Sequence, residues 1–310
     1  MKILVTSTSF QDTPGKHHEL LKSKNFDLDF KRGPLSEAEL MAMKWNYDGI
    51  IMGDDEYTKS VLQLAKNGGL KILSKYGVGL DKVNLPVAKE LGIEVRNCPG
   101  LNHKTVAEHV YALLFTNLKN IFNEIQYTRN GEWKRMTGYE ITGKTIAIIG
   151  LGKIGKEVAR IAKCFDMKIL AYDKFINHEY VNQNGIQVIS DLKKDLIEAD
   201  IITLHCNLDE SSTNLISNEI LFNGTKDEVI IVNTARAHLV DRDALHLALK
   251  EKKIGAYLAD VWFEEPMLPN EPLKDFDNVY ITPHIASRTF DNVVKQGIKS
   301  IENLCDFLGV

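Results

Sequence analysis

The sequence of 310 residues predicts an α/β protein with two parallel-sheet domains and a cleft between them. Short apolar runs alternate with amphipathic segments that have helical spacing, which is the pattern of a parallel sheet covered by helices. This alternation occurs twice, on either side of a long helical stretch at residues 105–128. The composition is 44% hydrophobic and 26% charged, as in globular proteins, and the chain is long enough for two cores.

The first series of elements occupies about one hundred residues. Four short apolar runs are predicted as strands, at residues 2–6, 49–52, 71–74 and 93–95. Three stretches between them are predicted as helices, at residues 35–44, 58–66 and 85–91. Because strands and helices alternate, we expect a mostly parallel sheet with helices on both faces.

The second series is larger. Six strands are predicted, at residues 145–149, 168–172, 201–205, 229–233, 255–260 and 279–282. Six strands with intervening helices match the size of a dinucleotide-binding domain.

Two proline-containing junctions, at residues 98–100 and 282–284, bracket the second series. We therefore expect a discontinuous first domain of residues 1–99 plus 285–310, with residues 290–308 packed back on it as a helix. Residues 100–284 form the second domain in this interpretation. The helix at 105–128 is apolar on more than one side, which indicates a covering surface from another domain or another subunit.

Charge and composition argue against several classes of protein. The formal net charge is −4 and no long basic run occurs, so we do not expect nucleic-acid binding. No stretch approaches the roughly 20 apolar residues of a membrane span, and the N-terminal apolar run is too short for a signal peptide. We therefore expect a cytoplasmic location. The four cysteines show no C-x-x-C spacing, so we expect no metal site, and in a reducing compartment we expect free thiols.

Residues 150–155 fit the pattern G-x-G-x-x-G, between a predicted strand and an amphipathic helix. In this setting Gly150 permits the tight turn, Gly152 lets the backbone approach a pyrophosphate, and Gly155 allows the helix to pack closely on the strand. The N–H groups and the positive dipole end of the helix favour phosphate groups. The motif therefore predicts a Rossmann-like domain that binds a dinucleotide.

Asp173 ends the next predicted strand, 23 residues after Gly150. A carboxylate there accepts hydrogen bonds from the adenosine ribose and repels a 2′-phosphate, so the sequence favours NAD over NADP. Lys174 argues the other way, since it could turn toward a phosphate. The alternative is that Asp173 is only a turn residue at the end of a strand.

Three polar residues follow strands of the second series, at the edge where open α/β sheets bind ligands. Arg236 offers two parallel donors to a carboxylate, and His284 is a proton donor that ordinarily titrates near neutrality. Glu265 would fix the tautomer of His284 if the two residues meet. Such a set suits hydride transfer to a 2-keto acid. As an alternative, Arg236 is a surface residue with a structural or solvent partner. Eight other histidines are alternatives to His284 as the proton donor.

These motifs together resemble the D-isomer-specific 2-hydroxyacid dehydrogenase family, which includes phosphoglycerate dehydrogenases, glyoxylate/hydroxypyruvate reductases and D-lactate dehydrogenases. The similarity spans nearly the whole chain and includes residues 75–81, 102–108, 150–155, 233–236, 260–266 and 283–286. It implies an NAD-dependent oxidoreductase that transfers a hydride between NAD(H) and C2 of a small D-2-hydroxy acid or 2-keto acid. It also implies a homodimer that is formed through the helix at 105–128.

The resemblance assigns roles to individual residues. Arg236 is implied as the carboxylate anchor, Glu265 as the histidine partner and His284 as the acid/base. The backbone amides of Val78 and Gly79 are implied as further contacts to the substrate carboxylate. Lys75 and Tyr76 beside them are also candidates for substrate binding, Tyr76 as the lining of a pocket for an apolar side chain. Cofactor contacts are implied for Thr105, Gly150, Gly152, Lys153, Ile154, Gly155, Asp173, His205, Cys206, Thr234, Ala235 and Asp260. The sequence departs from the family at Ala237, where glycine is usual, and at Cys206–Asn207, where proline is usual.

The substrate and two rival functions stay open at this point. A glyoxylate or hydroxypyruvate type of substrate is slightly favoured, because Asp54 and Asp55 stand where phosphoglycerate dehydrogenases often place arginine and would repel a phosphate. A 3-phosphoglycerate dehydrogenase is the alternative, because Lys75 could face a phosphate. Glu265 argues against formate oxidation, in which no hydroxyl proton is exchanged. A non-enzymatic NAD(H)-sensing protein of the corepressor type shares the Arg/Glu/His set.

Overall fold

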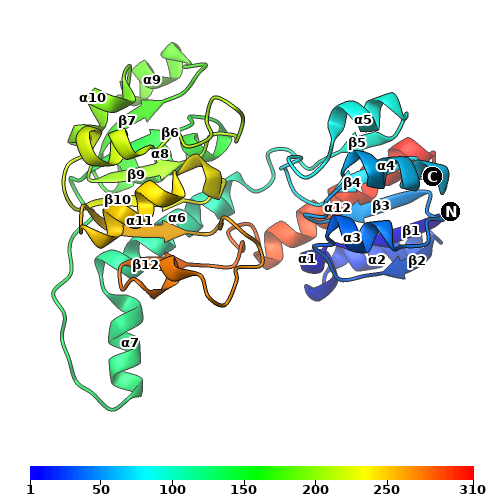
Figure 1. Cartoon of the computed structure of the whole chain (residues 1–310), viewed down its shortest axis with the longest axis horizontal. Helices are drawn as coiled ribbons and strands as arrows, with labels where there is room; N and C mark the ends of the chain where they lie inside the picture. Colours follow the sequence, from blue (N-terminus) through cyan, green and yellow to red (C-terminus); the bar gives the residue numbers. More distant parts are fainter. The chain divides into compact units, whose positions relative to one another are not determined.

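The computed structural model describes residues 1–310, and the chain forms two compact units (Figure 1). Unit 1 comprises residues 1–102 and 287–310, and unit 2 comprises residues 103–286. Each unit holds one parallel β-sheet with its own buried core. The prediction of an α/β protein with two parallel-sheet domains is therefore confirmed.

The sheet of unit 1 has the strand order β2-β1-β3-β4-β5, and every pair of neighbours is parallel. The strands are β1 Lys2–Val5, β2 Asp27–Phe30, β3 Gly49–Met52, β4 Ile72–Lys75 and β5 Glu94–Arg96. One face is covered by α1 Thr8–Asp12, α2 Lys16–Ser23 and α12 Phe290–Leu308. The other is covered by α3 Glu37–Met41, α4 Lys59–Asn67 and α5 Leu85–Glu90. Successive residues of β1 point to opposite faces, which is why Ile3 and Leu4 belong to different cores.

Three elements of unit 1 were not predicted, namely β2, α1 and α2. The strand β2 carries the sequence DLDF at the edge of the sheet, and its two aspartates and partial exposure hide the apolar alternation. The helix α1 is only five residues long and begins at the side-chain cap of Ser7. In α2 only His17 and Leu21 are buried, so its amphipathic pattern is weak.

The sheet of unit 2 has the order β12-β11-β10-β9-β6-β7-β8 and is parallel throughout. The strands are β6 Thr145–Ile149, β7 Lys168–Tyr172, β8 Gln187–Val188, β9 Ile201–Leu204, β10 Val229–Asn233, β11 Ile254–Ala259 and β12 Val279–Ile281. Only β8, with two residues, was not predicted, because it is too short to show a pattern. The strand order reverses between β6 and β9, and ligands of such sheets bind at this point.

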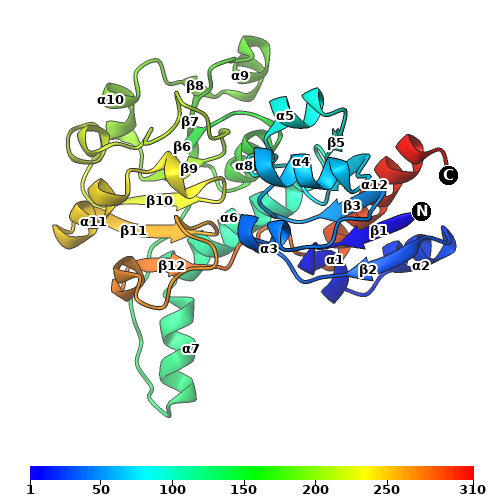
Figure 2. The ribbon, with the colours of Figure 1, turned by 45° about the vertical axis from the view of Figure 1, so that its right-hand side comes forward.

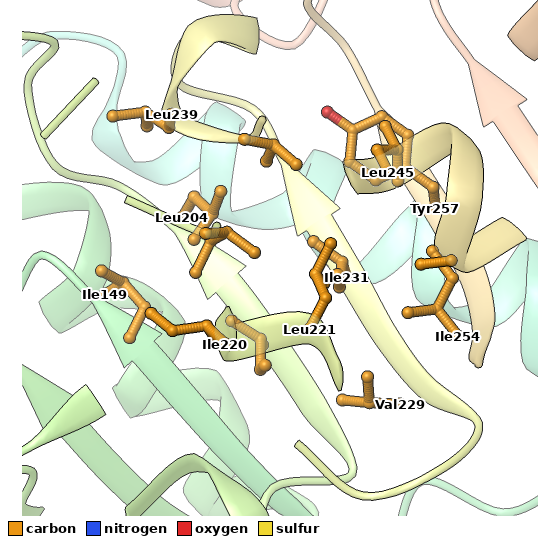
Figure 3. Close-up of a cluster of buried hydrophobic side chains, with 14 of the residues drawn as sticks. Ile149, Leu204, Ile220, Leu221, Val229, Ile231, Leu239, Leu245, Ile254 and Tyr257 are labelled. Carbon is orange, nitrogen blue, oxygen red and sulfur yellow. The ribbon is translucent and has the colours of Figure 1, made fainter. Parts of the chain in front are cut away.

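Helices cover both faces of this sheet. On one face lie α6 His103–Leu118, α8 Lys153–Cys164 and α9 His178–Asn184. On the other lie α10 Leu192–Asp195, the turns η1 Leu196–Glu198 and η2 Ile220–Gly224, and α11 Arg242–Lys250. Figure 3 shows the core of this second face, where Leu221 and Leu245 pack beside strand residues such as Ile231 and Tyr257. Two further turns, η3 Ala237–Leu239 and η4 Pro272–Asp275, lie near the strand ends.

The single helix predicted at residues 105–128 is wrong, because the chain forms two helices here. The first, α6, ends at Leu118, and α7 follows at Ile121–Arg129. Asn120 between them has a φ of +52°, in the left-handed region that asparagine tolerates better than most residues and that interrupts a helix. No residue of α7 is buried, and α7 stands away from the sheet of its own unit in both views (Figures 1 and 2). None of the helices combines the length and apolar character of a membrane span.

Candidate active site

The glycine loop of unit 2 follows β6 at the switch point. Gly150 has a φ of +101°, and a Cβ there would lie 2.5 Å from the backbone nitrogen of Cys206. A Cβ on Gly155 would lie 2.1 Å from the carbonyl oxygen of Gly150, so both glycines are required by packing. A Cβ on Gly152, by contrast, would meet no atom within 4 Å. Because Gly152 is the N-cap of α8, the loop leaves open space at a helix N-terminus, as a pyrophosphate requires.

Asp173 follows β7 and is bonded to the glycine loop. Its Oδ2 accepts a hydrogen bond from the Leu151 N–H at 2.7 Å, and its Oδ1 accepts one from the Phe175 N–H at 2.8 Å. The neighbouring Lys174 ammonium lies 2.9 Å from the Asp209 carboxylate, which neutralises its charge. The lysine is therefore held by an acidic partner, which weakens the argument that it would favour a 2′-phosphate.

His205 and Cys206 follow β9, on the other side of the switch point. Nε2 of His205 lies 2.8 Å from Thr203 Oγ1, and burial of the ring lowers the pKa of His205 to about 3. Its Nδ1 and the Thr234 hydroxyl are buried without a hydrogen-bond partner in the protein. Two such atoms beside the strand ends fit polar groups of a ligand. Burial raises the pKa of the Cys206 thiol to about 11, so this cysteine is not a nucleophile at neutral pH.

We expect His205, whose ring nitrogen Nδ1 is buried, to make the protein less stable in acid. Its pKa is lowered on folding, so below pH 6.5 the unfolded chain binds a proton that the folded chain does not, and stability falls with falling pH. Part of the residue is exposed, so the expected loss between about pH 7.5 and pH 4.5 is about 2 kcal/mol. The measurement is the free energy of unfolding in urea at the two pH values. His205→Asn should reduce the difference between them by that amount, and the control His178→Asn, at an exposed histidine, should leave it unchanged. If the free energy of unfolding depends on pH equally in the wild type and in His205→Asn, the prediction is wrong.

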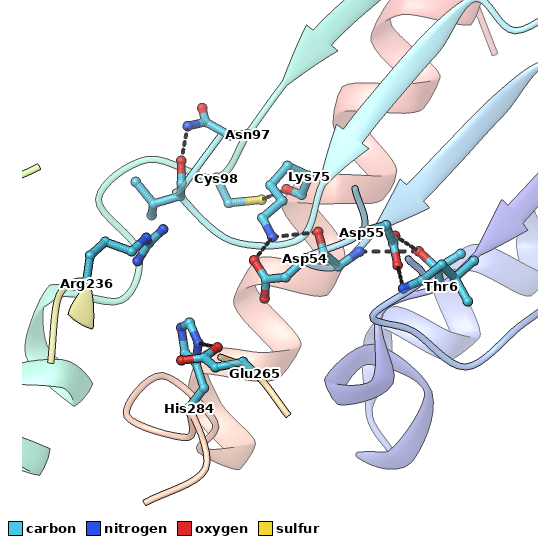
Figure 4. Close-up of polar contacts among 12 residues, drawn as sticks. Thr6, Asp54, Asp55, Lys75, Asn97, Cys98, Arg236, Glu265 and His284 are labelled. Atoms are coloured by element: carbon cyan, nitrogen blue, oxygen red, sulfur yellow. Dashed lines mark hydrogen bonds and ion pairs between the residues drawn. The ribbon is translucent and has the colours of Figure 1, made fainter. Parts of the chain in front are cut away.

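The three residues predicted for chemistry, Arg236, Glu265 and His284, follow β10, β11 and β12. Figure 4 shows the side chains of Glu265 and His284 directed toward each other. Nδ1 of His284 lies 2.8 Å from Glu265 Oε2, and Glu265 Oε1 accepts a hydrogen bond from the Trp262 N–H at 2.8 Å. The structure thus brings Glu265 and His284 together, which the sequence left open. Arg236 donates from Nη1 to the carbonyl oxygen of Ala235 at 2.8 Å.

The turn that carries Arg236 is shaped by Asn233, which was not predicted as a site residue. The buried side chain of Asn233 donates to the Arg236 carbonyl oxygen at 2.9 Å and accepts from the Ala235 N–H at 3.1 Å. An asparagine directly after a buried strand is the signal that could have identified it. Thr105, another predicted cofactor residue, donates from Oγ1 to the Ala286 carbonyl oxygen at 3.3 Å.

Unit 1 carries the four residues predicted for substrate contacts. The turn after β4 includes Gly77, with a φ of +124°, and neither Val78 nor Gly79 uses its N–H in a backbone hydrogen bond. Nζ of Lys75 lies 2.6 Å from the Gly53 carbonyl oxygen and 2.6 Å from Asp54 Oδ1 (Figure 4). The Tyr76 ring is instead buried in the core of the unit, and burial raises the pKa of its hydroxyl.

Asp54 and Asp55, which stand next to each other in the sequence, have different surroundings. Asp54 pairs with Lys75, whereas Asp55 is buried and accepts hydrogen bonds from Thr6 Oγ1 and from the Leu35 N–H (Figure 4). Burial raises the pKa of Asp55. Asp55 therefore joins the ends of β1 and β3 to the loop before α3, and it does not present a second surface charge against a phosphate.

Comparison with known proteins identifies the family. Residues 111–286 match the family model described as D-isomer specific 2-hydroxyacid dehydrogenase, NAD binding domain. The chain is 34% identical to a D-3-phosphoglycerate dehydrogenase of Archaeoglobus fulgidus, over 98% of this chain and 56% of that protein. It is 36% identical to a glyoxylate reductase of Korarchaeum cryptofilum, over 92% of this chain and 87% of that protein. The chain thus spans little more than half the length of the first relative.

Solved structures agree with these sequence matches. The apo-structure of D-lactate dehydrogenase from Escherichia coli superimposes with a TM-score of 0.85 at 29% identity, covering 100% of this chain and 97% of that one. The family and the NAD-binding domain predicted from the motifs are confirmed. The chain belongs to the D-isomer specific 2-hydroxyacid dehydrogenase family.

Proposed function

We propose that the protein is an NAD-dependent oxidoreductase that transfers a hydride between NAD(H) and C2 of a small D-2-hydroxy acid or its 2-keto acid. The observation that carries the proposal is the hydrogen bond of 2.8 Å between His284 Nδ1 and Glu265 Oε2. A histidine oriented by a carboxylate is a suitable acid/base for a substrate hydroxyl. In this proposal unit 2 is the NAD-binding domain and unit 1 is the substrate-binding domain.

The residues of the chain supply a proton and charge stabilisation, and the bound cofactor supplies or accepts the hydride. Because Glu265 bonds Nδ1 of His284, Nε2 is the atom that exchanges a proton with the oxygen on C2. In reduction the carbonyl carbon gains the hydride and the oxygen gains this proton. The Arg236 guanidinium binds the substrate carboxylate in this proposal. The N–H groups of Val78 and Gly79, on unit 1, stay candidates for substrate contacts.

The residues present fit NAD. The open space at Gly152 would take the pyrophosphate at the first turn of α8, where Lys153 and Ile154 present their backbone N–H groups. The Asp173 carboxylate would accept hydrogen bonds from the ribose. The remaining cofactor contacts are proposed for residues around the other strand ends: Thr105, Gly150, Gly155, His205, Cys206, Thr234, Ala235 and Asp260.

The surroundings of Lys75 favour a substrate without a phosphate group. Its ammonium is bonded to Asp54 and to a carbonyl oxygen, and its side chain is only 4% exposed. A lysine that is neutralised in this way offers no net positive charge to a phosphate. We therefore rank a 2-keto acid of the glyoxylate or hydroxypyruvate type above a phosphorylated one.

The test is NADH consumption against glyoxylate, hydroxypyruvate, pyruvate, 2-ketoisocaproate and phosphohydroxypyruvate, each repeated with NADPH. We expect oxidation of NADH with glyoxylate or hydroxypyruvate well ahead of the other acids. Preference for phosphohydroxypyruvate would overturn the substrate class and leave the reaction class in place. Tight NADH binding without turnover on any acid would favour the NAD(H)-sensing alternative.

We expect Asp173→Ala to narrow the preference for NADH over NADPH. The substitution removes the ribose hydrogen bonds and the repulsion of a 2′-phosphate, so NADH binding should weaken by roughly tenfold while NADPH binding improves. The measurement is the ratio of the two dissociation constants from cofactor fluorescence. An exposed acidic residue far from the loop, Glu228, provides the control Glu228→Ala. An unchanged ratio would reject the ribose role of Asp173.

We propose that the protein is a homodimer in the cytoplasm. The exposed apolar side chains of α7, Ile121, Phe122 and Ile125, need a partner surface of matching character, and a second copy of the chain would supply it. The four cysteines are all free, which fits a reducing compartment. Sedimentation should show a dimer for the wild type and a monomer for Phe122→Glu. A wild-type monomer would contradict the proposal.

A further inference from the structure

A chain of hydrogen bonds within unit 2 joins helix α6 to the segment that carries His284. Nε2 of His109, on α6, lies 2.9 Å from Thr282 Oγ1. The Thr282 hydroxyl lies 2.6 Å from Asp260 Oδ1. The Asp260 carboxylate then accepts hydrogen bonds from the Ile285 N–H at 2.8 Å and from the Ala286 N–H at 2.7 Å. The last two amides directly follow His284 in the chain.

The direction of this chain follows from the donors. Asp260 is almost completely buried and accepts only, so the Thr282 hydroxyl donates its single proton to it. Thr282 Oγ1 then accepts from His109 Nε2, which lies 2.9 Å from it and 3.5 Å from Asp260 Oδ1. Burial lowers the pKa of His109, which favours the uncharged ring at pH 7. In that form one ring nitrogen carries a proton, and Nε2 is the nitrogen that donates it.

His284 needs such support because its backbone is held in an uncommon conformation. Its φ is +55°, in the left-handed region that is rare for residues with a side chain. The His284 N–H donates to the Thr282 carbonyl oxygen at 2.9 Å, and the two following N–H groups donate to Asp260. Thr282 and Asp260 therefore fix the backbone on both sides of His284, and this sets the direction from which its ring meets Glu265.

We propose that His109 and Thr282 are positioning residues for His284. They orient the Asp260 carboxylate, which holds the peptide groups after His284 in the conformation that keeps its imidazole on Glu265. The inference rests on the proposed function for the catalytic meaning of His284. Neither His109 nor Thr282 needs to touch the substrate for this role.

The test compares pairs of substitutions at the two positions. Thr282→Val keeps the shape and removes the hydroxyl, and His109→Leu removes the donor. Each should lower kcat on the order of 10²-fold, because small displacements of an acid/base group have effects of this size. NADH binding should weaken by much less than kcat falls, because Asp260, which is also a proposed cofactor residue, keeps its charge in both variants. Thr282→Ser and His109→Gln keep a hydroxyl and a side-chain N–H, and both should retain most of the activity.

The control variant is Thr116→Val, the same substitution as at Thr282 but on the exposed side of α6. The Thr116 hydroxyl donates only to the Ala112 carbonyl oxygen of its own helix, at 2.8 Å. Its removal should leave kcat unchanged. Loss of activity in this variant equal to that of Thr282→Val would overturn the proposal.

A spectroscopic measurement separates positioning from a general loss of structure. The proton shared by His284 Nδ1 and Glu265 should give a downfield proton resonance in the wild type, and it should shift in Thr282→Val and return in Thr282→Ser. Wild-type kcat and resonance in both Thr282→Val and His109→Leu would overturn the proposal. The proposal would also be overturned if Thr282→Ser and Thr282→Val lost the same amount of kcat and both had a lowered midpoint of urea unfolding. If the wild type reduces no keto acid but the resonance responds as described, the proposed function fails while the positioning role stands.

Discussion

Replacing His284 by alanine is expected to lower kcat by roughly 10²- to 10⁴-fold, the usual contribution of a positioned acid/base. Its ring is bonded to Glu265 through Nδ1, which leaves Nε2 to exchange a proton with the substrate oxygen. The affinity for NADH should change little, since the cofactor residues proposed above are other side chains. The measurement is kcat with the best keto acid of the panel, alongside the dissociation constant of NADH.

Two companion variants sharpen this result. Glu265→Gln keeps the shape but removes the charge that fixes the His284 tautomer, so it should lie between wild type and His284→Ala in kcat. His246→Ala changes an exposed histidine on α11 and should leave kcat unchanged. A His284→Ala variant that keeps wild-type turnover, or that loses NADH binding instead, would remove His284 from the acid/base role.

Gly155→Ala is expected to damage both stability and cofactor binding. The added Cβ would lie 2.1 Å from the carbonyl oxygen of Gly150, a backbone atom within the loop that cannot move alone. Helix α8 must therefore shift away from β6, at a cost of about 1–3 kcal/mol or more for an overpacked site. The shift would also move the N–H groups at the start of α8. The dissociation constant of NADH should therefore rise by about tenfold or more, the effect of losing one hydrogen bond to a charged group. Urea unfolding and fluorescence titration measure the two effects.

Gly152→Ala is the matched control for this prediction, because a Cβ there meets no protein atom within 4 Å. Its free energy of unfolding should stay close to that of the wild type, while NADH binding weakens because the methyl group occupies the space proposed for the pyrophosphate. If Gly155→Ala instead unfolds like the wild type, the close packing of α8 on the glycine loop is not what stabilises this unit. If Gly152→Ala binds NADH normally, the pyrophosphate does not lie there.

Much of the fold could be predicted because its signals are local. The strands β3, β6, β7 and β10 have the predicted bounds, since each is a buried apolar run whose ends are marked by polar residues or glycine. The helix α12 also has the predicted bounds, from the cap of Thr289 to Gly309. The elements that were missed or wrong depend on less local features. The edge strand β2 is half polar, and the break at Asn120 comes from one backbone conformation in an otherwise helical pattern.

The sequence by itself determined the two parallel sheets, the glycine loop and the strand ends at which polar residues gather, because periodicity and glycine spacing act over a few residues. Only the tertiary structure decided which of those polar residues meet. His284 and Glu265 are 19 residues apart, and Lys75 and Asp54 are 21 apart, and both pairs form because neighbouring strands of a parallel sheet end at the same edge. The burial of Asp260 and Asp55 likewise has no local signal. A buried carboxylate is stable only where distant donors reach it, as Thr282 and Thr6 do here.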